Sequence, residues 1–130
     1  MVRPPSAYGV LTTTGRKTGK RRRRCIRAVR SGDRIYAVAI KGSARTGWVK
    51  NALASPEVRL RLPGGTVSAR ARAIRDDERA AARAAYVETV QPFDYPTYLN
   101  WRTGRPTATR IQALLGSWFD EGFPIVMEIS

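Results

Sequence analysis

The clearest periodic pattern lies between residues 58 and 74, where apolar and charged side chains alternate. Val58-Arg59-Leu60-Arg61-Leu62 puts three apolar side chains on one face of a strand and two arginines on the other. Pro63-Gly64-Gly65 turns the chain, and residues 66–74 return with Val67 and three alanines on one face. The pattern predicts a β-hairpin with an apolar inner face and an arginine-rich outer face.

Other segments predict further strands and helices around this hairpin. Apolar stretches near residues 8–11, 22–29, 34–40 and 125–129 predict strands. Helical spacing predicts a short helix from Trp48 to Ser55, an alanine-rich helix from Asp76 to about Val90, and a helix capped by Thr107 or Thr109. We therefore expect one α+β domain over residues 1–130, mainly an antiparallel, barrel-like sheet with external helices.

Charge is the strongest compositional signal. The 130 residues carry 24 Lys+Arg against 10 Asp+Glu, a formal net charge of +14. Such a field attracts nucleic acid, an anionic membrane surface, or a phosphorylated and carboxylated cofactor. The chain has no histidine and a single cysteine, Cys25. Serine- or cysteine-histidine catalysis and histidine or thiolate metal sites are thereby excluded, so an enzyme of this composition would rely on a cofactor.

Targeting signals are not visible. No run of about 18 apolar residues predicts a membrane span, and Met1-Val2-Arg3-Pro4-Pro5 lacks the apolar region of a secretory signal. The lone Cys25 cannot form an internal disulfide. We therefore expect a reduced, cytoplasmic setting.

A basic, glycine-containing loop separates the first two predicted strands. Residues 11–20 read Leu-Thr-Thr-Thr-Gly-Arg-Lys-Thr-Gly-Lys. Gly15 and Gly19 can adopt positive φ and direct successive backbone N–H groups into one concavity, which three cations would surround. The register is not that of a Walker A loop. The loop suits a phosphate or carboxylate, and a solvated basic turn is the alternative.

The order of motifs resembles a known family. The loop of residues 11–20 is followed by Ser-Gly-Asp-Arg at residues 31–34, Lys-Gly-Ser at residues 41–43, Trp-x-x-Asn at residues 48–51 and Ser-Pro-Glu-Val at residues 55–58. This order resembles the deazaflavin-dependent nitroreductases and quinone reductases, which are actinobacterial split β-barrel proteins. The resemblance implies an FMN-binding split-barrel-like fold. It also implies hydride transfer from reduced 8-hydroxy-5-deazaflavin (coenzyme factor 420) to a small oxidised acceptor such as a quinone or nitro compound.

The resemblance also implies the residues that hold the coenzyme. In the family this loop holds the phosphate and acidic tail, which here points to Thr14, Gly15, Arg16, Lys17, Thr18, Gly19 and Lys20. The segment after the buried strand meets the deazaflavin ring through small residues and backbone groups, which here are Lys41, Gly42, Ser43 and Ala44. The Trp48 and Asn51 pair completes the expected cofactor site.

An aromatic segment follows the alanine-rich helix. Tyr95, Tyr98 and Trp101 are spaced i, i+3, i+6 and would share one face if the segment is helical. This face resembles the substrate-side tyrosines of the family, so Tyr95 and Tyr98 are candidate catalytic residues that cover the ring or donate a proton. Plain core packing against the barrel is the alternative.

Other functions stay open at this point. A basic nucleic-acid-binding module would explain the charge, although aromatic residues are not interleaved with the strand arginines. A split barrel that binds FMN, or that carries a cofactor without turnover, would share the phosphate loop. Peripheral membrane association would suit a lipophilic quinone, but no amphipathic anchor is evident. The oligomeric state is not specified by the sequence.

Overall fold

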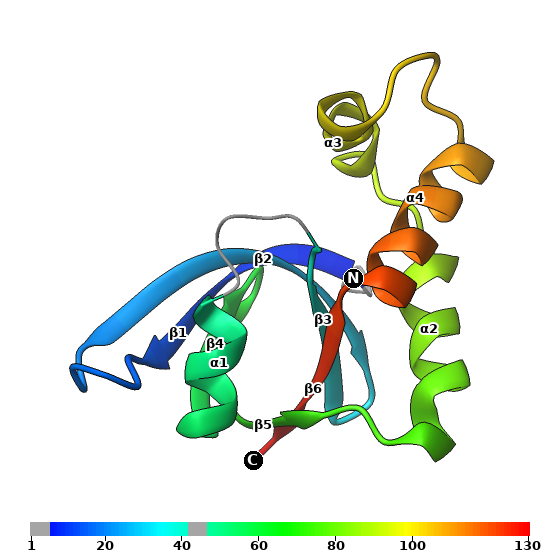
Figure 1. Cartoon of the computed structure of the whole chain (residues 1–130). Helices are drawn as coiled ribbons and strands as arrows, with labels where there is room; N and C mark the ends of the chain where they lie inside the picture. Colours follow the sequence, from blue (N-terminus) through cyan, green and yellow to red (C-terminus); the bar gives the residue numbers. More distant parts are fainter. Residues whose placement is uncertain (1–5, 42–46) are drawn as a thin grey trace.

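The computed structural model describes residues 6–41 and 47–130 (Figure 1). These residues form six strands, four α-helices and one 3-10 turn. In chain order they are β1 (Ser6–Thr14), β2 (Arg21–Ser31), β3 (Arg34–Ala39), α1 (Gly47–Ala54), β4 (Glu57–Leu62), β5 (Gly65–Ala73), η1 (Asp76–Glu78), α2 (Arg79–Glu88), α3 (Asp94–Trp101), α4 (Ala108–Glu121) and β6 (Phe123–Ile129).

The strands close into one antiparallel barrel in the order β1-β2-β3-β6-β5-β4. The predicted hairpin is β4–β5, with Val58 opposite Ala69 and Leu60 opposite Val67. β1 pairs with both β2 and β4, so it connects the N-terminal β1–β2 hairpin to the β4–β5 hairpin. The predicted fold class, an antiparallel split-barrel-type sheet with helices packed on it, is confirmed.

Side-chain alternation divides the apolar residues between two cores. Inward-facing strand residues such as Leu11, Ile35 and Leu60 form the barrel interior, which Trp48, Val49 and Ala52 of α1 complete. Outward-facing residues of β2, β3 and β6 form a second cluster with α2, α3 and α4. Because side chains alternate along each strand, the inner face of the barrel is apolar throughout, whereas its outer face is apolar mainly where the helices cover it.

The β1–β2 hairpin extends well beyond the rest of the sheet. β1 and β2 pair continuously from Ser6–Val29 to Thr14–Arg21. β2 pairs with β3 only from Val29–Tyr36 to Ser31–Arg34. Figure 1 shows the hairpin reaching away from α2, α3 and α4. The strands β2 and β3 therefore leave a split between them on the side of the hairpin.

Helices α2 and α3 are fixed to the barrel through a buried arginine of β2. The Arg27 guanidinium donates to both carboxylate oxygens of Asp94, at 3.0 and 3.2 Å, and to the carbonyl oxygens of Tyr86 and Thr89, each at 3.0 Å. Both charged side chains are only 2% exposed. Asp94 also accepts a hydrogen bond from the backbone N–H of Gln91. This fully paired cluster holds the corner between α2 and α3 against β2.

The predicted aromatic helix forms, but its aromatic side chains do not share one environment. Pro96 is accommodated because it lies in the first turn of α3, where backbone N–H groups have no helical partner. Tyr98 is buried in the outer cluster, whereas Tyr95 and Trp101 are each 39% exposed. Positions three apart on a helix are rotated by about 60°, so Tyr95 and Trp101 lie on either side of Tyr98, and only Tyr98 is buried; the three side chains do not share one environment.

Candidate functional site

The basic loop between β1 and β2 is a tight turn closed by its own hydrogen bonds. The backbone N–H of Gly15 donates to the Lys20 carbonyl at 2.7 Å, and that of Gly19 donates to the Gly15 carbonyl at 2.8 Å. The Lys20 N–H donates to the Thr18 hydroxyl at 3.3 Å. These bonds consume N–H groups that the sequence analysis expected to point into an open concavity. The N–H groups of Gly15, Gly19 and Lys20 are therefore not free to meet an anion, contrary to the open concavity that the sequence predicted.

The two loop glycines serve different purposes. Gly19 has φ 70°, as expected for a left-handed turn residue. Gly15 is not in the left-handed region; it is buried where a Cβ atom would lie 3.0 Å from the Thr18 hydroxyl and 3.2 Å from the Lys20 carbonyl oxygen. Gly15 is therefore required by close approach within the turn, and Gly19 by backbone conformation.

Asn51 of α1 joins the loop to the barrel. Its side-chain oxygen accepts hydrogen bonds from the Arg16 backbone N–H at 3.2 Å and from Arg16 Nη1 at 2.9 Å. Asn51 is buried, and both hydrogen bonds to its side-chain oxygen are partly buried. The structure thus brings together two of the predicted site residues that are far apart in sequence. Arg16 is held by Asn51 although it is exposed, and its neighbours Lys17, Thr18 and Lys20 are exposed without such a contact to α1.

The remaining predicted coenzyme contacts lie beside this arrangement. Thr14 ends β1 and is half-buried, and Lys41 is exposed just after β3. Gly42, Ser43 and Ala44 lie outside the described residues. Trp48 is buried, and it both completes the barrel interior and faces a small pocket.

That pocket, of about 110 Å³, lies where β2 and β3 separate. We call it the split pocket. It is lined by residues of the barrel strands, of α1 and of the outer helices, namely Tyr8, Arg24, Cys25, Ile26, Arg27, Val38, Ile40, Trp48, Tyr86 and Trp118. Its walls are therefore aromatic and aliphatic, with guanidinium, phenol and indole groups among them.

The polar groups of the split pocket are mostly hydrogen-bond donors. Trp118 Nε1 is buried and has no hydrogen-bond partner within the described part of the chain. Burial raises the pKa of Tyr86 to about 12 and also raises the pKa of Tyr8, so both phenols stay protonated at neutral pH. An unsatisfied indole N–H costs free energy unless a ligand accepts its hydrogen bond. The pocket thus suits the edge of a planar ring that carries an acceptor oxygen or nitrogen.

Neither predicted catalytic tyrosine lines the split pocket. Tyr98 borders a different hollow, between the end of α3 and the start of α4, and Tyr95 is exposed. Their catalytic role stays a prediction. The sequence analysis missed Tyr8, Tyr86 and Trp118 as pocket residues. Strand parity would have placed Tyr8 on the outer face of β1, but no local pattern reveals that the helices bring Tyr86 and Trp118 to the split.

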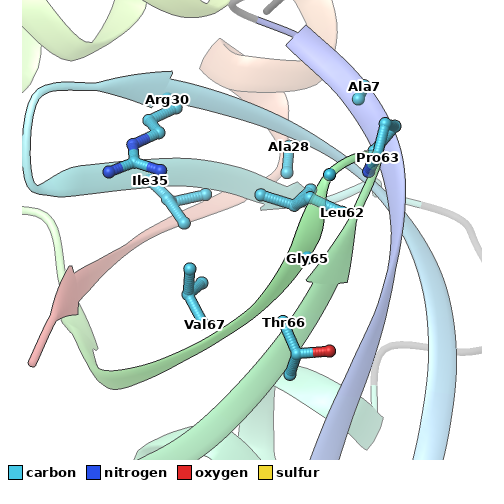
Figure 2. Close-up of a pocket in the computed structure, with 10 residues that line it drawn as sticks. Ala7, Ala28, Arg30, Ile35, Leu62, Pro63, Gly65, Thr66 and Val67 are labelled. Atoms are coloured by element: carbon cyan, nitrogen blue, oxygen red, sulfur yellow. The ribbon is translucent and has the colours of Figure 1, made fainter.

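A second hollow, of about 140 Å³, lies at the opposite mouth of the barrel. Figure 2 shows Ile35, Leu62 and Val67 pointing toward one another there, with Arg30 at the rim. The turns between β2 and β3 and between β4 and β5 form this end. None of the residues predicted to hold the coenzyme lines this mouth, so we do not assign the site to it.

Within residues 6–41 and 47–130, no three histidine, cysteine, aspartate or glutamate side chains are grouped so that they could hold a metal ion. Over the same residues, no helix has the length and hydropathy needed to cross a bilayer.

Solved structures share the fold at low sequence identity. An F420-H2 dependent reductase (FDR-A) is 23% identical, with a TM-score of 0.61, and the match covers 98% of this chain and 97% of that one. An FAD-binding protein from Mesorhizobium loti is 14% identical, with a TM-score of 0.54 and coverage of 95% and 80%. HutZ, a heme storage protein from Vibrio cholerae, is 12% identical, with a TM-score of 0.58 and coverage of 95% and 81%. These likenesses establish the fold, and proteins with this fold carry different cofactors.

A family assignment comes from the sequence itself. The sequence model of one family, described as F420H(2)-dependent quinone reductase, matches residues 4–113. That range includes the basic loop, α1 with Trp48 and Asn51, and most of the residues that line the split pocket. The resemblance inferred from the order of motifs is therefore confirmed. The chain belongs to the F420H(2)-dependent quinone reductase family, whose members are oxidoreductases that use this reduced deazaflavin coenzyme.

Proposed function

We propose that this protein transfers a hydride from reduced coenzyme factor 420 to a quinone, or to a nitro compound of similar size, bound beside the split pocket. One observation carries the proposal. Helix α1 connects the two halves of the site, because Asn51 holds Arg16 of the basic loop and Trp48 lines the split pocket. A ligand with an anionic tail and a planar ring would meet both halves.

The basic loop suits the anionic part of the coenzyme. Lys17 and Lys20 are exposed, and no carboxylate of the described chain forms an ion pair with either. Arg16 is held in place by Asn51, so a guanidinium is already positioned before an anion arrives. Thr14 and Thr18 add hydroxyl donors. We assign the phosphate and the glutamyl tail to this loop.

The split pocket suits one edge of the ring. When bound, the reduced deazaflavin supplies a hydride from C5, and the chain has to position it, exclude water and stabilise the acceptor. Trp48 provides an apolar surface, and the unpaired Trp118 Nε1–H provides a donor for a ring oxygen or nitrogen. Lys41 to Ala44 complete the proposed contacts, of which Gly42, Ser43 and Ala44 lie outside the described residues. At about 110 Å³ the split pocket alone admits only part of a tricyclic ring.

Protonation of the reduced acceptor needs a nearby acid. Tyr8 and Tyr86 line the split pocket and stay protonated, whereas Tyr95 and Tyr98 lie on α3. Tyr86 is fully buried, so Tyr8 is the more accessible phenol; its hydroxyl lies 3.5 Å from the Thr97 hydroxyl. We place Tyr8 beside Tyr95 and Tyr98 as a candidate proton donor.

Turnover with a defined acceptor tests this function. Reduced coenzyme and menadione are mixed with the protein, and coenzyme oxidation is followed by absorbance. We expect turnover that falls at least tenfold in Lys17→Ala, chiefly through a higher KM for the coenzyme, and that is unchanged in Arg105→Ala, a surface cation remote from the loop. Comparing Tyr8→Phe, Tyr95→Phe and Tyr98→Phe then identifies the proton donor by its lower kcat. Absence of turnover with quinones and nitro compounds, despite tight coenzyme binding, would contradict the proposal and favour a carrier.

A further inference from the structure

Four arginines gather on the outer face of the barrel, on the side that the helices leave uncovered. Arg21 and Arg23 come from β2, and Arg59 and Arg61 come from β4. With Val10, Thr12 and Thr66 they line one groove of about 210 Å³. We call these four residues the arginine face.

Strand register explains why the four side chains meet. Thr12 of β1 is paired with Arg23 on one side and with Arg59 on the other. Strands lie about 4.8 Å apart, so the two arginine Cα atoms flank Thr12 at a separation of about 10 Å. Extended arginine side chains can span half of that distance. Both guanidinium groups can therefore reach one anion seated over the Thr12 hydroxyl.

The arginine face is not neutralised from within the protein. On the neighbouring strand β5, Arg70 is paired with Glu57 at 2.6 Å and Arg72 is paired with Glu78 and Glu128. None of the four arginines forms an ion pair within residues 6–41 and 47–130. Glu57 borders the adjacent groove together with Arg21 and Arg59, but Arg70 already holds it. Four like charges held together without an acid repel one another, and an external anion would relieve that repulsion.

The arginine face adjoins the coenzyme site at Thr14, which borders the neighbouring groove with Arg21 and Arg59, whereas none of the loop residues 15–20 lines either groove. Successive side chains of β2 point to opposite faces, and Ile26 and Ala28 face the barrel interior. Arg22 and Arg24 therefore share the inner parity; Arg22 approaches Gly15 of the loop, and Arg24 lines the split pocket. Arg21 and Arg23 lie on the opposite side of the same strand. The four consecutive arginines from Arg21 to Arg24 therefore contribute alternately to two surfaces of the protein.

The shape and chemistry of the groove favour one class of ligand. No exposed aromatic side chain lines it, so it lacks the stacking surface of a single-strand nucleic-acid site. It also lacks an exposed apolar anchor of the kind that inserts into a membrane. Guanidinium groups bind phosphoryl oxygens in pairs, and four of them around so small a groove match several negative charges in a compact volume. We propose that the arginine face is a binding site for a compact polyphosphate, such as a free or esterified diphosphate.

Calorimetric titration with inorganic pyrophosphate tests the proposal at physiological salt. We expect saturable binding of one pyrophosphate per chain, about tenfold weaker in Arg59→Gln and weaker again in the double variant Arg23→Gln/Arg59→Gln. Arg30→Gln removes the same charge from β2 at the other mouth of the barrel and should change affinity less than twofold. Equal thermal midpoints of the ligand-free variants show that the fold is intact.

Three outcomes would overturn the proposal. One is loss of pyrophosphate binding in Lys17→Ala with retention in the double variant, which would place the anion on the coenzyme loop. The second is an absence of saturable binding by the unaltered protein. The third is tighter binding of a short DNA duplex or of oligo-glutamate than of pyrophosphate, again dependent on Arg23 and Arg59. The Lys17→Ala variant also separates this proposal from the proposed function. If the variant fails to bind the coenzyme but still binds pyrophosphate, the arginine face is unaffected.

Discussion

The arginines under the helices and the arginines on the open hairpins have opposite surroundings. Arg27 is 4% exposed, and acceptors on α2 and α3 and between them occupy its guanidinium. Arg23 and Arg59 are exposed, and no carboxylate in the described part of the chain pairs with them. The same residue type therefore holds the fold together on one side of the barrel and is left available on the other. Unpaired arginines of this kind contribute to the net charge of +14 and are available to an external anion.

The largest expected effect comes from breaking the buried pair. Asp94→Ala should lower the free energy of unfolding by about 3–5 kcal/mol, because it leaves the Arg27 guanidinium buried without its carboxylate. Urea denaturation measures the loss. Asp120→Ala is the matched control, since it breaks the exposed pair with Arg83 and should cost less than about 1 kcal/mol. Equal losses in the two variants would contradict the claim that burial makes the Arg27–Asp94 pair essential to the fold.

Acid should weaken the second paired cluster in a defined pH window. Arg72 donates to Glu78, and together with the Arg75 backbone N–H it lowers the pKa of Glu78 from 4.5 to about 2. Because the folded-state pKa is lower, this stabilisation is complete above pH 4.5 and is lost as the pH falls toward 2. A shift from 4.5 to about 2 corresponds to about 3 kcal/mol.

Urea midpoints from pH 7 to pH 2.5 measure this contribution. Glu78→Gln should be less stable than the unaltered protein at pH 7, and the difference should shrink below pH 4.5. A difference that is independent of pH would show that the Glu78 carboxylate does not supply the stabilisation.

A smaller effect is expected where the fold meets the site. Asn51→Ala removes the acceptor that fixes Arg16 against α1, so the loop has to be ordered when the coenzyme binds. We expect coenzyme affinity to fall by about tenfold, which corresponds to about 1.4 kcal/mol. Fluorescence titration measures it, with the exposed Asn100→Ala as control. An unchanged affinity would mean that the loop does not need this connection.

The smallest effect concerns an exposed pair on β4 and β5. Arg70 and Glu57 are 66% and 72% exposed, so their interaction should contribute about 0.2–1 kcal/mol in a double-mutant cycle. It should fall further in 1 M salt, where screening acts over about 3 Å. An interaction free energy above 2 kcal/mol between Arg70 and Glu57 would contradict the contrast with the buried pair of Arg27 and Asp94.

Much of the barrel could be predicted because its signal is local. The alternation of Val58 to Leu62 with Ala69 and Ala71 requires one buried face, and the observed register is the one that buries both strands' apolar residues. The cap at Thr107 was also readable, since its side chain accepts from the Arg110 N–H. The basic loop was identified from its own glycines and cations, and the family resemblance added Asn51 as a site residue. The contact between Asn51 and Arg16 was not predicted.

The remainder depends on contacts between distant segments. The local sequence around Arg27 or Asp94 does not predict a buried ion pair. The two residues are 67 positions apart, and in sequence each resembles an ordinary surface charge. Glu78 falls in the first turn of the helix predicted from Asp76, where carboxylates favour the helix start and are ordinarily exposed, yet it is 7% exposed and paired with Arg72. Tyr8, Tyr86 and Trp118 meet at the split pocket only after the helices pack on the outer face. Tertiary packing thus decided which polar groups are structural and which line the site.

Coenzyme binding tests the central claim, that the basic loop holds the anionic part of a deazaflavin. Coenzyme factor 420 with and without its glutamyl tail, FMN and a short DNA duplex are titrated by fluorescence at fixed salt. The account predicts the tightest binding for the tailed deazaflavin, a loss of at least tenfold in Lys17→Ala, and little change in Arg105→Ala. Tighter binding of DNA or FMN, or equal affinity of the Lys17→Ala variant for the deazaflavin, would contradict it.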